Sequence, residues 1–140
     1  SNTIIGCDGF GYEKDKDGCN IKFPHLGKVI VNNNVEIGSL CSIARGTLDN
    51  TIINQGVKID NHVYIAHNVL VGKNSMLMSG SKVNGSAKIG KNCWIGTGAM
   101  IREGVNVGDN AIVGMGSVVV KNINEKSTVI GNPARQWGRE

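Results

Sequence analysis

The sequence contains three histidines, and one of them, His67, stands where it could transfer a proton near neutral pH. If eighteen residues make one turn of a repeating fold, the same position in later turns is held by Gly85, Glu103 and Lys121. Three turns span about 14 Å at the usual strand separation of about 4.8 Å. An imidazole, a position without a side chain and an ammonium group therefore share one line, which suits a substrate with a long arm that ends in phosphates.

This column favours attack of an amine or hydroxyl on a thioester. A neutral imidazole at His67 can accept the proton of the attacking group. A backbone N–H at Gly85 can approach the oxygen that becomes negative in the tetrahedral intermediate. The thiol then leaves, without a covalent enzyme intermediate. Asp60 is a further catalytic candidate, which could orient the imidazole or bind the acceptor amine, whereas His62 is expected at a surface or interface.

The same column predicts the binding site of the acyl donor. We expect the arm of an acyl thioester donor, a co-substrate, to pass Gly85 and Glu103, while no cofactor is bound permanently and no metal is expected. The phosphates of the donor are expected near three cationic side chains, Lys121, Lys126 and Arg135. Thr97 and Met115, one turn apart, are candidates for the opposite wall of the arm.

A repeat of aliphatic residues every six positions must position this column. The leaders of the repeat are Val31, Ile37, Ile43, Ile53, Ile59, Ile65, Val71, Leu77, Val83, Ile89, Ile95, Ile101, Val107, Val113 and Val119. A period of six is neither the 3.6 of a helix nor the alternation of an isolated strand, and it is typical of a hexapeptide β-helix with three hexads in each triangular turn. The fifteen leaders predict an all-β, single-stranded, left-handed parallel β-helix of about five coils.

Interruptions of the repeat divide the chain into three parts. Residues 1–30 are expected to form an irregular first coil, in which a loop over 11–28 interrupts a hexad led by Ile5. Residues 31–120 form the β-helix, where a spacing of ten between Ile43 and Ile53 makes four residues of 47–51 bulge from a corner. Residues 121–140 are expected as a closing loop and tail after the repeat stops. Both insertions are either solvated loops or substrate contacts. Because the chain begins inside a repeat, we expect an upstream domain to be missing.

Composition agrees with this architecture and narrows the partners. Gly is 20 of 140 residues and aromatics are 4%, which favours a repetitive fold over a core of large rings. The net charge of +4 is too small and scattered to predict nucleic-acid binding. No signal peptide, membrane span or C-x-x-C pair is present, so a cytoplasmic location is expected. Cys41 and Cys93 occupy repeat positions and are expected to be small buried hydrophobes.

Most of residues 4–105 resembles the UDP-3-O-acylglucosamine N-acyltransferase family of lipid A synthesis. The resemblance rests on I-G-C-D-G-F-G-Y at 5–12, G-T-L-D-N-T at 46–51, I-D-N at 59–61 and I-A-H-N-V at 65–69. It implies that His67 is the catalytic base and that Gly85 supplies the oxyanion contact. It also implies a homotrimer with three sites between subunits.

The end of the chain departs from that family. Gly104 stands where the family carries a second histidine, and a long carboxy-terminal helical extension is missing. Residues 130–135, I-G-N-P-A-R, are similar to the ending of sugar and serine acetyltransferases that use acetyl-CoA. Together the two resemblances imply transfer of an acetyl or short acyl group from CoA to the amine, or a hydroxyl, of a nucleotide-linked amino sugar, in lipopolysaccharide or surface-glycan synthesis.

Three alternatives remain open from the sequence. The first is a long-chain N-acyltransferase of lipid A type, with an acyl carrier protein as donor. The second is a γ-carbonic-anhydrase-like zinc enzyme, because His62 and His67 are five apart and His25 is the one candidate for a third ligand. The third is a scaffold without activity, since solenoid turns present flat surfaces to partners.

Overall fold

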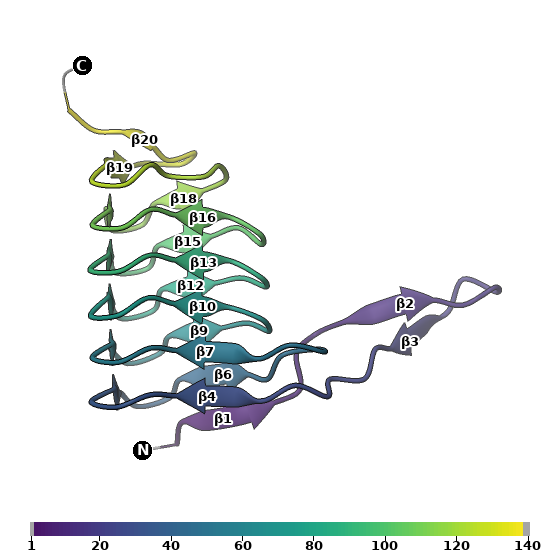
Figure 1. Cartoon of the computed structure of the whole chain (residues 1–140). Coiled ribbons are helices and arrows are strands. Elements are labelled where there is room, and N and C mark those ends of the chain that lie inside the picture. Colours follow the sequence, from purple (N-terminus) through teal and green to yellow (C-terminus); the bar gives the residue numbers. More distant parts are fainter. Residues whose placement is uncertain (1, 139–140) are drawn as a thin grey trace.

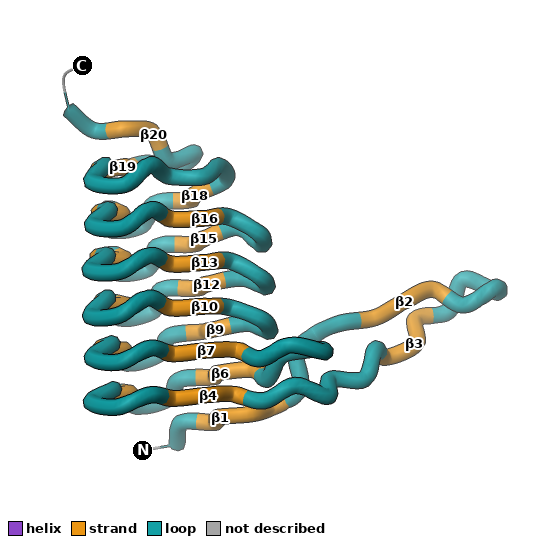
Figure 2. The backbone as a smooth tube through the Cα atoms, in the orientation of Figure 1, coloured by secondary structure: helices purple, strands orange, loops and turns teal. Residues whose placement is uncertain are grey.

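Short parallel strands wind around a triangular prism, and each turn adds one strand to each of three sheets (Figure 1). The computed structural model describes residues 2–138. Figure 2 shows strands joined by turns throughout this range. Residues 2–138 contain no helix long and apolar enough to cross a membrane. The all-β parallel β-solenoid expected from the six-residue period is confirmed, with about six turns rather than five.

Three sheets form the faces of the prism, and we number them by the first strand of each. Sheet 1 contains β1 (Ile4–Cys7), β6 (Ser42–Ala44), β9 (Tyr64–Ile65), β12 (Lys82–Val83), β15 (Met100–Ile101) and β18 (Val118–Val119). Sheet 2 contains β4 (Val29–Val31), β7 (Thr51–Ile53), β10 (Leu70–Val71), β13 (Lys88–Ile89) and β16 (Asn106–Val107). Sheet 3 contains β5 (Glu36–Ile37), β8 (Lys58–Ile59), β11 (Met76–Leu77), β14 (Trp94–Ile95), β17 (Ile112–Val113), β19 (Thr128–Ile130) and β20 (Arg135–Gln136).

The strand register is the one that the repeat predicts. Val83 pairs with Ile65 in the turn below and with Ile101 in the turn above, each 18 residues away. These three side chains are completely buried inside the prism, and the residue before each leader points outward. Successive leaders therefore stack into one continuous apolar core, because every turn places the same hexad position over the last.

The ends of the prism differ from the predicted repeat. The repeat was expected to stop after Val119, but Ile123 bridges Val107 and β19 pairs with β17, so the chain makes a further turn. Ile112 pairs with Thr128, 16 residues away rather than 18, which means that this turn is two residues shorter. The shortening moves Ile123 and Val129 out of the six-residue phase, although both are buried. The expected closing loop is thus partly regular strand.

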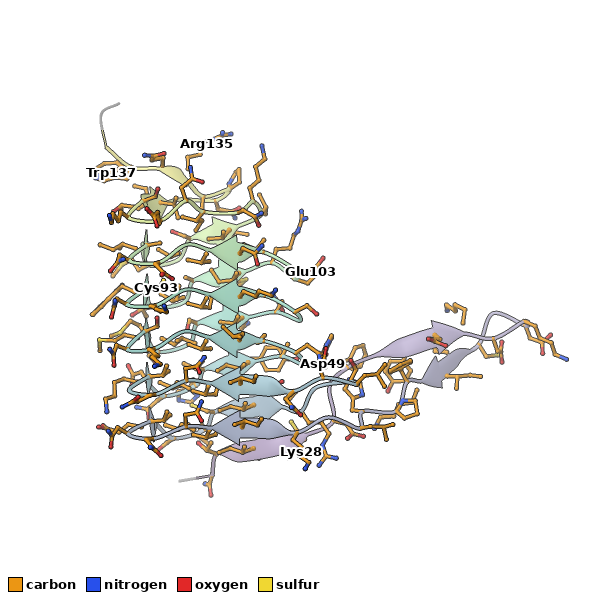
Figure 3. The ribbon with its side chains drawn as sticks, viewed as in Figure 1. Lys28, Asp49, Cys93, Glu103, Arg135 and Trp137 are labelled. Carbon is orange, nitrogen blue, oxygen red and sulfur yellow. The ribbon has the colours of Figure 1, made fainter. Side chains whose placement is uncertain are left out.

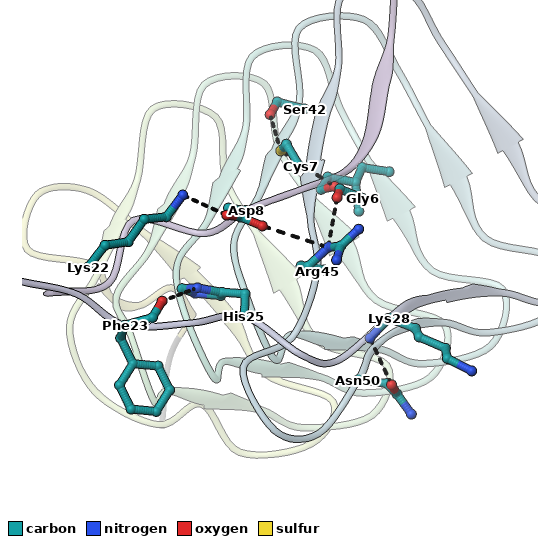
Figure 4. A network of polar contacts seen from close by, with 11 residues as sticks. Gly6, Cys7, Asp8, Lys22, Phe23, His25, Lys28, Ser42, Arg45 and Asn50 are labelled. Carbon is teal, nitrogen blue, oxygen red and sulfur yellow. Dashed lines mark hydrogen bonds and ion pairs between the residues drawn. The ribbon is translucent and has the colours of Figure 1, made fainter.

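The first insertion forms an arm that projects from the prism (Figure 1). Its strands β2 (Tyr12–Lys14) and β3 (Asn20–Lys22) pair as an antiparallel hairpin. At its root Asp8 accepts a 2.6 Å ion-pair hydrogen bond from Lys22, and the Arg45 Nε atom lies 3.9 Å from the same carboxylate (Figure 4). Hydrogen bonding and attraction by Lys22 lower the pKa of Asp8 below its usual value. The insertion is a structured hairpin with a charged clamp at its root, rather than an irregular loop.

The buried cysteines are part of the core, as expected. Cys41 and Cys93 are each 2% exposed, and all four cysteines are free thiols. The Cys93 thiol donates to the Gly108 carbonyl at 3.1 Å, and burial raises the pKa of this thiol. The Cys93 thiol therefore stays neutral, and both cysteines fill the space of a small apolar side chain.

Removal of a stacked leader should destabilise the whole prism. Ile95→Ala leaves a cavity in place of a fully buried side chain, and we expect a loss of about 2–5 kcal/mol in the free energy of unfolding. Ile112→Ala is the matched control, because Ile112 lies on the same sheet and is 46% exposed. Denaturant unfolding measures both variants. Equal losses for the two would contradict the stacked core.

Candidate active site

His67 lies at the edge of the prism where sheets 1 and 2 meet, between β9 and β10. A cavity of about 630 Å³ opens beside it. Its lining residues are Thr47, Leu48, Asp49, Asn50, Ile52, His67, Asn68, Leu70, Ser86 and Lys88. The corner over 45–50, which contains the four extra residues, supplies four of these side chains, and so the second insertion shapes the cavity instead of only looping into solvent.

Asn68 determines which nitrogen of His67 carries the proton. The Asn68 Oδ1 atom accepts the Thr47 backbone N–H at 3.2 Å and the Thr47 hydroxyl at 3.0 Å. A backbone N–H can only donate, so this atom is the carbonyl oxygen of the amide. The same oxygen lies 2.9 Å from His67 Nδ1, which must then donate as N–H. The neutral imidazole therefore keeps its lone pair on Nε2, where a general base needs it.

Gly85 lies directly against the imidazole. A Cβ atom at this position would be 2.6 Å from His67 Nε2 and 2.7 Å from Cε1, which is too close for any side chain. Among residues 2–138 the Gly85 N–H has no hydrogen-bond partner, whereas its carbonyl accepts from Gly104 N–H at 2.9 Å. The expected juxtaposition of the His67 imidazole and a bare backbone position is thus present in the structure.

The other members of the predicted column rise along the same edge. Glu103 is exposed on this edge above Gly85, on the side of the prism from which the arm projects (Figure 3). Lys121 lines a smaller cavity of about 200 Å³ at the top of the prism, together with Ser127 and Gln136. The line from the His67 imidazole to the Lys121 ammonium group therefore runs along one edge within one chain.

The remaining donor candidates are dispersed over other parts of the prism. Thr97 and Met115 are exposed at the edge between sheets 3 and 1, and so they do not face His67 within the same chain. Lys126 lies at the edge between sheets 2 and 3. Arg135 is exposed on β20 above the last turn (Figure 3). Of the cations expected to bind the donor phosphates, Lys121 is therefore the one that lies on the same edge as His67 within one chain.

Asp60 is not brought to His67. It lies at the edge between sheets 3 and 1 and lines a separate cavity with Lys58 and Met76. Its Oδ1 atom accepts the Asn61 backbone N–H at 2.7 Å. The expected role of orienting the imidazole is filled by Asn68, which hexad arithmetic missed although it directly follows His67.

The residues of the zinc hypothesis do not form one cluster. His62 is exposed at the edge between sheets 3 and 1, with φ of 60°, while His67 is at the next edge. His25 does approach His67, with 5.7 Å between ring centroids. Over residues 2–138, no three His, Cys, Asp or Glu side chains form a group that could hold a metal ion.

Comparisons with known proteins agree with the fold. The model of the bacterial transferase hexapeptide (six repeats) matches residues 86–121. The UDP-3-O-acylglucosamine N-acyltransferase of Francisella tularensis subsp. holarctica is 54% identical over 76 residues, which are 54% of this chain and 23% of that protein. The resemblance expected from the sequence is confirmed over part of the chain: it is similar to hexapeptide-repeat β-helix acyltransferases.

Solved structures extend the likeness over the whole chain. The UDP-N-acetylglucosamine O-acyltransferase of Moraxella catarrhalis RH4 superposes with a TM-score of 0.88 at 25% identity, covering 99% of this chain and 52% of that one. The acetyltransferase domain of PglB from Neisseria gonorrhoeae FA1090 superposes with a TM-score of 0.56 at 29% identity, covering 83% of this chain and 58% of that one. These likenesses confirm the left-handed β-helix, and the chain spans about a quarter of the length of the curated relative from Francisella tularensis.

Gly85→Ala should displace the imidazole from its place over the backbone. The added Cβ would overlap Nε2, so we expect His67 to adopt another rotamer and to lose the bond from Nδ1 to Asn68. A crystal structure of the variant measures this change. Glu103→Ala, one turn above on the exposed edge, is the control and should leave His67 in place. An unmoved imidazole in the Gly85→Ala variant would contradict the contact.

Proposed function

We propose that this protein transfers an acetyl or other short acyl group from a CoA thioester to the amine of a nucleotide-linked amino sugar. The observation that carries the proposal is the tautomer of His67, which leaves Nε2 free to accept a proton beside the unpartnered N–H of Gly85. His67 borders an open cavity, and the Gly85 backbone lies against its ring. A base and an oxyanion donor are the two elements that acyl transfer to an amine requires.

Each step of the reaction has a group in this site. The amine nitrogen of the acceptor attacks the thioester carbonyl carbon, and Nε2 of His67 takes the proton that the nitrogen loses. The carbonyl oxygen gains a negative charge, which the Gly85 N–H stabilises. The carbon–sulfur bond then breaks, and the imidazolium returns its proton to the leaving thiolate. The products are an amide and free CoA, and His67 is again neutral.

The cavity supports an acceptor that carries both hydroxyls and phosphates. Its lining combines the carboxylate of Asp49 and the amide of Asn50 with the ammonium of Lys88. Carboxylates and amides bind sugar hydroxyls, and an ammonium group binds phosphate as a point charge. The names of the relatives, which contain UDP-linked sugars, support the same class of acceptor.

The donor lies along the edge above His67 in this proposal. Its arm passes Gly85 and Glu103, and its phosphates lie near Lys121 at the top. Likeness to an acetyltransferase domain supports a CoA thioester with a short acyl group. The second candidate is a long-chain N-acyltransferase that takes its acyl group from an acyl carrier protein, and the 54% identity to a UDP-3-O-acylglucosamine N-acyltransferase favours it.

We also propose that the active molecule is a homotrimer. His67 lies on a convex edge of the prism, so one chain supplies only one side of a groove. A second copy placed against this edge would supply the other wall, and Thr97 and Met115 on another edge are available for that purpose. Light scattering that shows a stable monomer at micromolar concentration would count against the trimer.

His67→Ala should preserve the fold and donor binding but lower turnover by about a hundredfold or more, the usual contribution of one positioned acid–base group. His62→Ala, with an exposed histidine on another edge, is the matched control. Acyl transfer from acetyl-CoA and from acyl carrier protein to UDP-amino sugars measures both variants. Full activity of a folded His67→Ala protein would refute the proposed base.

Donor binding should depend on the cations at the top of the prism. Joint replacement Lys121→Ala and Arg135→Ala removes two charged partners of phosphate, and we expect CoA affinity to fall by about tenfold or more. Lys73→Ala, with an exposed lysine at the edge between sheets 2 and 3, is the control. Isothermal titration with CoA measures the change. Unchanged affinity in the double variant would place the donor elsewhere.

A further inference from the structure

The histidine beneath the site, His25, is a buried polar group that the proposed reaction does not use. It is 5% exposed, and its Nδ1 lies 2.9 Å from the Phe23 carbonyl oxygen (Figure 4). A carbonyl oxygen can only accept, so Nδ1 carries the proton and Nε2 carries the lone pair. Nε2 is buried and has no hydrogen-bond partner. An unpaired buried acceptor is costly, so packing alone does not explain a histidine here.

Two glycines make room for the His25 ring at the root of the arm. A Cβ atom on Gly9 would lie 2.7 Å from His25 Nε2 and 3.1 Å from His25 Cδ2. A Cβ atom on Gly11 would lie 3.1 Å from His25 Cε1. The imidazole therefore packs against the bare backbone that precedes β2. Its bond to Phe23 fixes it to the segment that follows β3.

The same seat touches the catalytic candidate. The rings of His25 and His67 meet edge to face, with centroids 5.7 Å apart and planes at 72°. A Cβ atom on Gly9 would also lie 3.1 Å from the Cβ of His67. The Gly9 backbone therefore lies against both the His25 ring and the base of the His67 side chain. His67 is contacted by Gly9 at its Cβ and by Gly85 at its ring.

The segment that follows His25 connects to the amide that orients His67. The backbone N–H groups of Leu26 and Gly27 donate to the Thr47 carbonyl at 2.7 and 2.8 Å. Thr47 in turn donates its N–H and hydroxyl to Asn68 Oδ1, the acceptor of His67 Nδ1–H. The ring of His25 is therefore linked to the Cβ of His67 through Gly9, and the backbone that follows His25 is linked to His67 Nδ1 through Thr47 and Asn68.

We propose that His25 is a positioning residue, which holds His67 in the Nδ1–H tautomer and in the rotamer that points Nε2 at Gly85. The inference rests on the proposed function for its catalytic consequence, but not for its structural one. A glutamine could replace His25, because its side-chain N–H can donate to the Phe23 carbonyl as Nδ1 does. Alanine leaves a void beside the His67 side chain, and leucine fills space without donating.

The decisive measurement is the nitrogen NMR signature of the His67 ring in His25 variants. Long-range proton–nitrogen spectra distinguish Nδ1–H from Nε2–H imidazole, and the chain has three histidines, so His62→Ala and His67→Ala assign the signals. We expect His67 to be Nδ1–H in the unmodified protein and in His25→Gln. In His25→Ala and His25→Leu we expect a mixture of tautomers.

Kinetics on the same variants test the consequence for the reaction. We expect kcat of His25→Ala to fall by roughly ten- to a hundredfold, the scale of a misplaced catalytic group, with KM for the acceptor within about twofold. His25→Gln should restore kcat. His62→Ala, which lies on another edge, should not change it.

Every outcome decides the proposal. A folded His25→Ala or His25→Leu protein whose His67 keeps the Nδ1–H signature overturns it, even if thermal stability falls. If alanine prevents folding, the contrast between leucine and glutamine decides in the same way. A tautomer that depends on His25 in a protein without acyl transfer supports the positioning role and refutes only the proposed function.

Discussion

The hydrogen bonds between successive turns are the constraint on which the rest of this structure depends. They fix a register of 18 residues through the regular part of the prism, and this register places His67, Gly85 and Glu103 on one edge. Turns separated by a strand spacing leave little room at an edge, so a ring in one turn needs a bare backbone in the next. The imidazole of His67 therefore fits in its observed position because residue 85 has no side chain.

A regular solenoid presents identical turns, and this chain becomes specific where it departs from regularity. Both early insertions meet at His67. The extra residues of the corner at 45–50 line the cavity and place Thr47 against Asn68, while the root of the arm places Gly9 and His25 beneath the ring. The repeat supplies the rigid support, and the insertions supply the orientation that a single histidine on a convex edge lacks.

The sequence predicted the architecture well because a six-residue period has few physical solutions. The inward leaders, the buried cysteines and the column above His67 all follow from position within the hexad. The same arithmetic could not show which edge of a neighbouring chain would face His67. In the structure Thr97, Met115 and Lys126 lie on edges away from His67. It also missed the last turn, where Ile123 and Val129 are buried two residues out of phase. The tautomer of His67 was beyond prediction, because Asn68 acts through a contact with Thr47 that exists only when the bulged corner folds back.

The shape of the site gives a physical reason for assembly. A base on a convex edge is open to water on one side, and charge developed in a wet site is stabilised only weakly. The prism cannot close the groove with its own faces, because each face turns away from the edge. The arm extends outward from the lower turns of the prism (Figure 1). A second copy is the simplest source of the missing wall, and its edge between sheets 3 and 1 carries Thr97 and Met115, which face no part of the site in their own chain. The two donor candidates that one chain leaves unexplained are thus accounted for by the proposed trimer.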